Sequence, residues 1–198
     1  MPAGRDVEAF EERAARYEHG WLGQLHREIV DRATAIALAS HPSPSRILDV
    51  GCGTGYQLRL LAHRCPDAVE LAGIDPAPAM VEVAQASAAD PRIAAQMGFA
   101  EQLPYVDDAF DLVLSTTSFD HWADQRAGLR ECARVLAADG RLVLVDLFSA
   151  FLIPTLVGAR RTKARTKARA NRLLAGEGLH PVGWQHVHPL INAVVAAR

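Results

Sequence analysis

Three glycines at alternate positions form the first pattern in this sequence that could bind a ligand. Gly51, Gly53 and Gly55 follow the short, largely apolar run 47–50 and precede a helical apolar face that begins at Leu58. Without Cβ atoms, such a turn lets a ligand approach the backbone, and the free N–H groups of the following helix point toward it. The pattern therefore predicts a strand, a ligand-binding turn and a helix.

An acidic residue ends the next apolar run. Asp75 closes the stretch 69–75, twenty residues after Gly55, where a carboxylate can accept both hydroxyls of a ribose. The competing dinucleotide-binding turn requires a third glycine where this chain has Tyr56. The tighter spacing favours a ligand without a pyrophosphate, and the simplest alternative is a turn that only connects a strand to a helix.

Four segments, which cover about half of the chain, together resemble the class I S-adenosylmethionine-dependent methyltransferases. The resemblance is closest to the small-molecule branch (methyltransferase type 11) that includes the ubiquinone and menaquinone C-methyltransferases. The matching segments are LDVGCGTG at 48–55, GIDPAPAM at 73–80, GFAEQLPY at 98–105 with FDLVLS at 110–115, and RVLAADGR at 134–141. The resemblance implies an enzyme that uses S-adenosylmethionine as its cofactor.

Strands that alternate with helices predict the α/β fold class. The expected helices are one or two within 1–40, then 56 onward, 76–88 and 123–136, and the expected strands are 47–50, 69–75, 92–98, 110–115, 140–146, and a closing hairpin of 182–188 with 191–196. Right-handed crossovers then place helices on both faces and ligands at the carboxyl ends of the strands. The resemblance implies a Rossmann-like, seven-stranded, mostly parallel sheet whose last strand is antiparallel.

Composition narrows the class of protein. The 198 residues are most economically one methyltransferase domain, with a helical arm at 1–40 and a cofactor-binding core at 46–198. A net charge of −2 provides no overall attraction for nucleic acid, and no apolar run is long enough to span a bilayer. Three cysteines without Cys-x-x-Cys spacing favour reduced thiols. We therefore expect a soluble cytoplasmic protein.

The resemblance assigns most candidate cofactor-binding residues. The glycine turn would contact the methionine part of the cofactor, Asp49 would hold its ammonium directly or through water, and Asp75 would bind the ribose. Asp75 has an alternative role as the N-cap of the following helix. Pro76 and Met80 would sandwich the adenine or pack in the core, and Tyr17 would close over the cofactor or pack on the core. Ser115 is a further candidate contact.

One position departs from the family pattern. Many relatives carry an aspartate directly before an Ala-Glu pair, and it accepts a hydrogen bond from the adenine amino group. This chain has Phe99 there. Either Phe99 stacks on the ring or Glu101 makes the polar contact, and the backbone N–H of Ala100 remains a possible donor.

Methyl transfer from a sulfonium requires mainly alignment and exclusion of water, because the cofactor already activates the electrophile. The reaction is an in-line displacement, and a base is needed only when the nucleophile is protonated at neutral pH. His121, in the loop after the fourth expected strand, is the candidate base. Alternatively, His121 is a partly exposed loop histidine without a catalytic role. The choice of O-, N- or C-methylation stays open.

The basic stretch 160–172 contains seven basic residues and no acid, and we expect it within a helix. Its simplest interpretation is a solvated helix face. The alternative is a surface that receives an amphipathic or aromatic acceptor with an acidic group, near a membrane. That surface would consist of Phe148, Phe151 and Leu152 with Arg160 or Arg161.

Other functions are less well supported by the sequence. A nicotinamide-dependent oxidoreductase is disfavoured by Tyr56 and the 98–105 segment, and nucleic-acid methylation by the lack of an Asn-Pro-Pro-aromatic motif. A non-catalytic binding module that keeps the cofactor fold is the second rival. His186 and His188 share a strand face, but two histidines without a third ligand do not predict a metal site.

Overall fold

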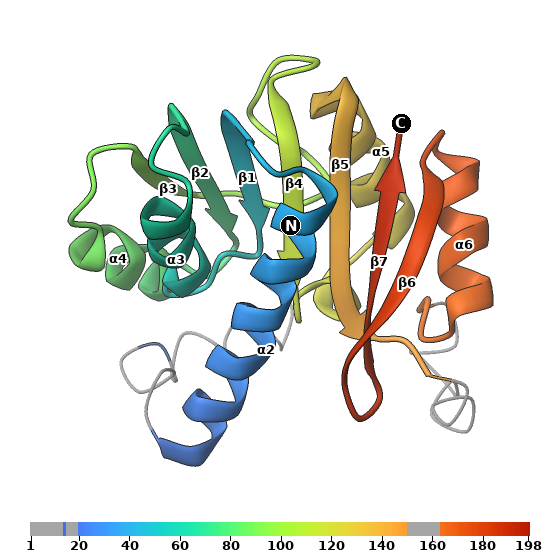
Figure 1. Cartoon of the computed structure of the whole chain (residues 1–198), viewed down its shortest axis with the longest axis horizontal. Helices are drawn as coiled ribbons and strands as arrows, with labels where there is room; N and C mark the ends of the chain where they lie inside the picture. Colours follow the sequence, from blue (N-terminus) through green and yellow to red (C-terminus); the bar gives the residue numbers. More distant parts are fainter. Residues whose placement is uncertain (1–13, 15–19, 150–162) are drawn as a thin grey trace.

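The computed structural model contains a seven-stranded sheet with helices on both faces (Figure 1). The structure describes residue 14, residues 20–149 and residues 163–198. The strands are β1 (Arg46–Val50), β2 (Glu70–Asp75), β3 (Ile93–Met97), β4 (Phe110–Thr116), β5 (Leu136–Leu147), β6 (His180–His188) and β7 (Ile191–Ala197). The helices are α2 (Gly20–Ser40), α3 (Tyr56–Arg64), α4 (Pro78–Ser87), α5 (Gln125–Val135) and α6 (Lys167–Gly176), with a 3-10 turn η2 (Phe119–His121).

The strand order is β3-β2-β1-β4-β5-β7-β6. The pairs from β3 to β5 are parallel, and β7 is antiparallel to both of its neighbours, as the opposite direction of its arrow shows in Figure 1. The predicted Rossmann-like fold is therefore confirmed. Since β1 and β4 run in the middle of the sheet in the same direction, their carboxyl ends lie at one edge of it.

Each face of the sheet carries its own apolar cluster. On one face Leu48 and Val50 pack with residues of α5 and α6, and on the other Ile47 packs with residues of α2, α3 and α4. This alternation follows from the period of two in a strand, and burial on both sides explains why β1 is almost continuously apolar. The described part of the N-terminal arm, α2, belongs to the second cluster through residues such as Ile29 and Ala33.

Two expected boundaries were wrong. Strand β5 begins at Leu136 rather than at Gly140, because Leu136 already pairs with Phe110 before the register shifts. Gly140 lies inside this irregular segment, where a Cβ would be 2.7 Å from the Cδ1 of Leu136, as expected for a glycine in an interrupted strand. Helix α6 begins at Lys167, so residues 163–166 of the basic stretch are not helical.

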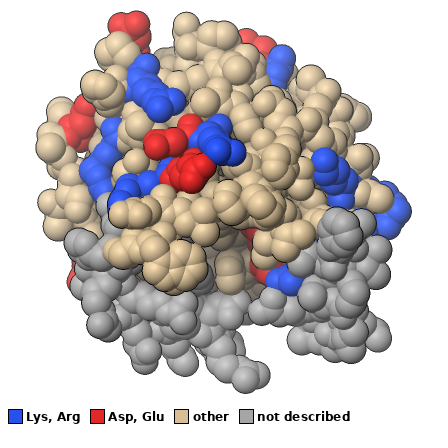
Figure 2. Space-filling view, turned by 60° about the horizontal axis from the view of Figure 1, so that its bottom comes forward, with Lys and Arg blue, Asp and Glu red and all other residues tan. Residues whose placement is uncertain are grey.

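No helix within residues 20–149 and 163–198 is both long and apolar enough to cross a bilayer. On the face that Figure 2 shows, acidic and basic side chains lie interspersed, and neither sign forms a continuous patch.

Candidate cofactor-binding site

The three glycines of the turn have backbone conformations that would strain a side chain. Gly51, Gly53 and Gly55 have φ angles of 82°, 52° and 77°, in the left-handed region that glycine readily adopts. At Gly51 space is limiting as well, because a Cβ would lie 2.2 Å from the Oγ of Ser118. At Gly53 no described atom lies within 4 Å of the Cβ position. The turn is therefore packed at one glycine and open to a ligand at another.

The backbone of the turn is tied to the end of β2. The N–H groups of Gly51 and Cys52 both donate to the carbonyl of Ile74, at 2.7 and 3.0 Å. Cys52 packs beneath the loop, where a Cβ on Gly73 would approach its Sγ to 2.8 Å, and burial raises the pKa of its thiol. A buried thiol with a raised pKa is a poor nucleophile, which agrees with a packing role.

Asp75 ends β2 and holds the turn through its carboxylate. Oδ2 accepts a hydrogen bond from the N–H of Gly53 and Oδ1 accepts one from Ala77, both at 2.9 Å. Asp75 is 8% exposed, and burial raises its pKa against the opposing effect of these two bonds. No Lys or Arg of the described segments pairs with it. Ala77 is the N-cap of α4, so the alternative role of Asp75 as that cap is wrong.

Asp49 is the second buried carboxylate of this region. It lies in β1 opposite Gly73 of β2, is 2% exposed, and its Oδ1 has no hydrogen-bond partner among the described residues. Burial, and to a smaller extent the charge of Asp75, raises the pKa of Asp49 to about 7. An unpartnered acceptor beside a second carboxylate favours a positively charged hydrogen-bond donor. An ammonium has that chemistry, so the residues present fit the methionine end of S-adenosylmethionine.

The candidates on the adenine side differ in how they are packed. Met80 is buried in a small cluster with Ala77 and Ala14, which agrees with its alternative role in the core, and Pro76 is half-buried. Phe99 is 44% exposed and so has a free ring face to offer. Two further residues lie on the same segment. Ala100 is buried, and an Oε1 of Glu101 accepts the N–H of Asp124 at the start of α5 (2.9 Å).

Ser115 supports the loop after β4. Its Oγ lies 2.8 Å from the Oγ of Ser118, which donates to the carbonyl of Val50. Trp122 in turn donates its indole N–H to the Oγ of Ser118 (3.3 Å). Ser115 is fully buried, so its observed role is to brace this loop against the end of β1. Ser118 was not predicted, because it meets Val50 across 68 residues and no local pattern marks it.

His121 is exposed at the end of η2, next to an ionic cluster that sequence reasoning missed. Its neighbour Asp120 forms an ion pair with Arg165, through Nε at 2.8 Å and through Nη2. Asp146, at the end of β5, accepts the N–H groups of Asp120 (3.0 Å) and Leu147 (2.6 Å). Burial raises the pKa of Asp146, and the nearby charge of His121 acts in the opposite direction. The cluster fixes the loop that carries the candidate base.

Some predicted residues lie outside the described part of the chain. Tyr17 falls there, as do Phe151, Leu152, Arg160 and Arg161 of the expected acceptor surface. Trp21 is described and is 71% exposed. Within the described residues, no three or more His, Cys, Asp or Glu side chains gather as metal ligands would. His186 and His188 lie on β6 as expected.

Comparison with known proteins identifies the domain. Residues 48–144, close to half of the chain, match the methyltransferase domain family. The chain is 35% identical over 116 residues to demethylmenaquinone methyltransferase of Thermotoga maritima, an alignment that covers 59% of this chain and 49% of that one. It is 33% identical over 146 residues to a ubiquinone/menaquinone biosynthesis C-methyltransferase of Geotalea daltonii, covering 70% and 61%. The chain thus spans about half to three fifths of the length of these curated relatives.

A solved structure shares the whole fold. An S-adenosylmethionine-dependent methyltransferase of Aquifex aeolicus superposes with a TM-score of 0.73 at 16% identity and covers 96% of this chain and 97% of that one. Residues 48–144 thus match the methyltransferase domain family, the solved structure shares the Rossmann-like fold that the sequence predicted, and the family match supports the predicted S-adenosylmethionine cofactor.

Proposed function

We propose that this protein transfers a methyl group from S-adenosylmethionine to a small-molecule acceptor by in-line displacement and releases S-adenosylhomocysteine. The observation that carries the proposal is the pair of buried carboxylates, Asp49 and Asp75, beside an open glycine turn. Neither carboxylate has a cationic partner in the described residues, and one oxygen of Asp49 has no partner at all among them. A ligand with an ammonium and a ribose diol would satisfy both.

When bound, the cofactor supplies a sulfonium that is already activated for attack. Asp75, pre-positioned by Gly53 and Ala77, accepts the two ribose hydroxyls with the lone pairs that its backbone contacts leave free. Asp49 holds the ammonium, and the open peptide at Gly53 allows the close approach that alignment requires. Phe99, with its exposed ring, covers the adenine in place of the family's aspartate.

The acceptor is proposed to lie beyond β4 and β5. The aromatic rings of Phe119, Trp122 and Phe148 pack against one another there, with centroid distances of 5.0 and 5.9 Å from Phe119. The three rings are buried in the core, so they form a rigid apolar base beneath the loop after β4, and an acceptor would contact the residues above them. The curated relatives are named for quinone methylation, which supports the same class. His121 serves as general base for acceptors that must lose a proton. Peripheral membrane contact through the basic stretch 160–172 would deliver a lipid-like acceptor.

The proposal includes a single methyltransferase domain over residues 1–198 that works in the cytoplasm. The support for this location is the three buried, unpaired cysteines, Cys52, Cys65 and Cys132, which suit a reducing compartment.

Calorimetric titration with S-adenosylhomocysteine, with NADH as a second ligand, tests the cofactor assignment. The wild-type chain should bind S-adenosylhomocysteine and not NADH, and Asp75→Ala should lose that binding. Asp67→Ala, a matched change of an exposed acid, should bind as the wild type does. Binding of NADH alone would favour an oxidoreductase, and binding without any turnover of quinones, phenols or amines would favour a non-catalytic module.

A further inference from the structure

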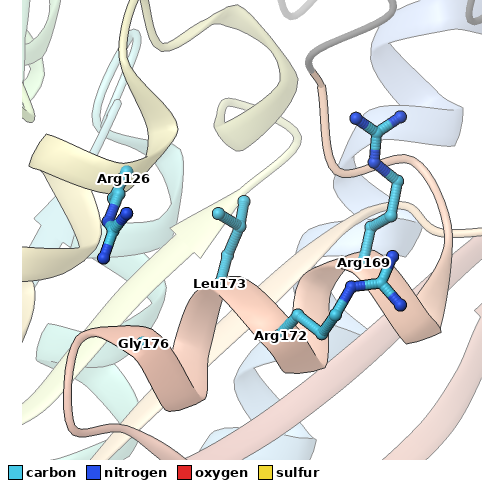
Figure 3. A pocket seen from close by; sticks show the side chains of 5 residues that line it. All are labelled: Arg126, Arg169, Arg172, Leu173 and Gly176. Atoms are coloured by element: carbon cyan, nitrogen blue, oxygen red, sulfur yellow. The ribbon is translucent and has the colours of Figure 1, made fainter.

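A second concave site lies between α5 and α6, away from the glycine turn. Its volume is about 300 Å³, and its walls are Arg126 of α5 and Arg169, Arg172, Leu173 and Gly176 of α6 (Figure 3). The lining includes no residue of β1, β2 or the turn. It is therefore distinct from the proposed cofactor site, and methyl transfer does not require it.

The residues of α6 that line the hollow all lie on one face of that helix. Positions 169, 172, 173 and 176 follow the i, i+3, i+4, i+7 pattern of a single helix face. The core contacts of α6 come from a different face, through Ala170 and Leu174, which are almost fully buried. A helix that only completed the core would close its contact with α5 by apolar side chains. Here two arginines and a glycine leave a hollow instead.

Positive charge at this hollow exceeds negative charge. Glu177, whose side chain is 5% exposed, pairs with Arg126 at 2.5 Å and with Arg130 at 3.0 Å. Arg169 and Arg172 have no acidic partner among the described residues. Glu177 thus pairs with two of the four arginines near the hollow, and the charges of Arg169 and Arg172 are not compensated by it. Like charges gathered around a concavity repel one another, and a bound anion would offset that repulsion.

We propose that this hollow binds the phosphate group of a small phosphorylated compound. Planar guanidinium forks match the geometry of phosphate oxygens, and three arginines from two helices line the hollow. Leu173 gives the site an apolar wall, and Gly176 lies beside Arg126, whose Nη2 is 3.7 Å from the glycine's Cβ position. The volume is at the low end of the range for small-molecule pockets, which fits a phosphate with a short organic part.

The site adjoins the loop that the proposed function uses. Arg126 is two residues from Asp124, the N-cap of α5, and Asp124 accepts the N–H groups of Arg126 and Ala127. The loop that carries His121 ends at this cap. A phosphate bound at Arg126 would thus lie at the base of the acceptor loop, either as part of an acceptor or as a separate effector.

Titration of the full chain with inorganic phosphate and with phenyl phosphate, followed by calorimetry, tests the proposal. Both should bind, phenyl phosphate more tightly because of Leu173, and the double variant Arg169→Gln/Arg172→Gln should weaken binding at least tenfold. Arg64→Gln, which removes an exposed arginine of α3, should leave binding unchanged. Arg172→Lys keeps the charge and loses the fork, so it should bind with intermediate affinity. Unchanged affinity in the double variant would overturn the proposal.

Two further experiments distinguish a small phosphorylated ligand from a lipid surface or a nucleic acid as the source of the phosphate. Sedimentation with phosphatidic acid vesicles and titration with a single-stranded oligonucleotide measure binding to a lipid surface and to a polymer. Competition of either by phenyl phosphate supports the small-ligand site. Binding to vesicles or oligonucleotide without any binding of phenyl phosphate would overturn it. Failure of this site would leave S-adenosylhomocysteine binding intact, so it cannot be confused with failure of the proposed function.

Discussion

Two pairs of aspartates lie at or just beyond the carboxyl ends of the strands, and they differ in what surrounds them. Asp49 and Asp75, on the β1–β2 side, have only backbone N–H partners or none among the described residues. On the β4–β5 side, the N–H of Asp120 donates to the carboxylate of Asp146, and Arg165 forms an ion pair with Asp120. The first pair therefore lacks a cation that the second pair already has.

The difference distinguishes a site that binds a ligand from a cluster that stabilises the fold. Leaving a carboxylate buried without a cation costs stability, and such groups persist where a ligand completes them. A buried ion pair satisfied within the chain has no such requirement and orders the segments that contribute to it. The four predictions below test this division.

Removal of the internal cation should have the largest effect. Arg165→Met removes the cation that pairs with Asp120 beside the buried Asp146, and we expect the free energy of unfolding to fall by about 3–5 kcal/mol. Urea denaturation at pH 7 measures this loss. The double change Arg165→Met/Asp120→Asn should recover part of it, because the uncompensated charge is gone. Equal stability of the two variants would show that Arg165 acts through packing alone.

Asp49→Asn should have the opposite effect on the cofactor-free protein. Because the pKa of Asp49 is raised to about 7, ionisation of this group destabilises the fold. The penalty is absent below the ordinary pKa of 3.8, grows as pH rises from 4 to 7, and is complete above pH 7. At pH 8 the variant should therefore be more stable by roughly 2–4 kcal/mol, and at pH 4 it should equal the wild type. A constant difference at both pH values would contradict this account.

Substitution of one aspartate in each pair should distinguish an effect on ligand affinity from an effect on stability. Asp75→Asn keeps the volume but replaces one accepting oxygen by an NH2 group, so it loses one of the two backbone hydrogen bonds and accepts the ribose hydroxyls more weakly. The Kd for S-adenosylhomocysteine should rise about a hundredfold, or about 2.7 kcal/mol. Asp146→Asn should leave that Kd within about threefold and lower the free energy of unfolding by about 1–3 kcal/mol. Calorimetry and urea denaturation on both variants measure the two effects, and a large loss of affinity in Asp146→Asn would remove the distinction.

The same contrast explains which parts of the molecule could be predicted. The turn, Asp49 and Asp75 lie within one strand-turn-helix-strand segment, where local glycine spacing and a polar residue in an apolar run mark them. Asp146 ends its strand as Asp75 does, so the same signal was present for it. Ser118 and Arg165 gave no signal, because their partners Val50 and Asp120 lie 68 and 45 residues away. Contacts of that range depend on how the chain folds rather than on local pattern.

The hollow between α5 and α6 shows a related limit. The surplus of basic residues was visible in the sequence, but the expected helix began too early, and its basic face could not be oriented. Only the position of α6 against α5 shows that Arg169 and Arg172 line the same hollow as Arg126. Composition indicated the charge, and the tertiary arrangement determined where that charge converges.

The smallest predicted effect is the pH dependence of cofactor affinity. The ammonium of S-adenosylhomocysteine requires ionised Asp49, whose pKa is about 7 in the free protein, with Asp75 and Cys52 as the titratable groups around it. Below pH 7 a proton must leave Asp49 before the ligand binds, so the affinity should fall by up to about tenfold per pH unit, or about 1.4 kcal/mol. Titrations between pH 5.5 and 7.5 measure the slope. Asp49→Asn should bind more weakly but with no slope, whereas Asp120→Asn should keep the wild-type slope, because its carboxylate already has a partner in Arg165. A slope that survives in Asp49→Asn would assign the proton to another group and would remove Asp49 from the ammonium site.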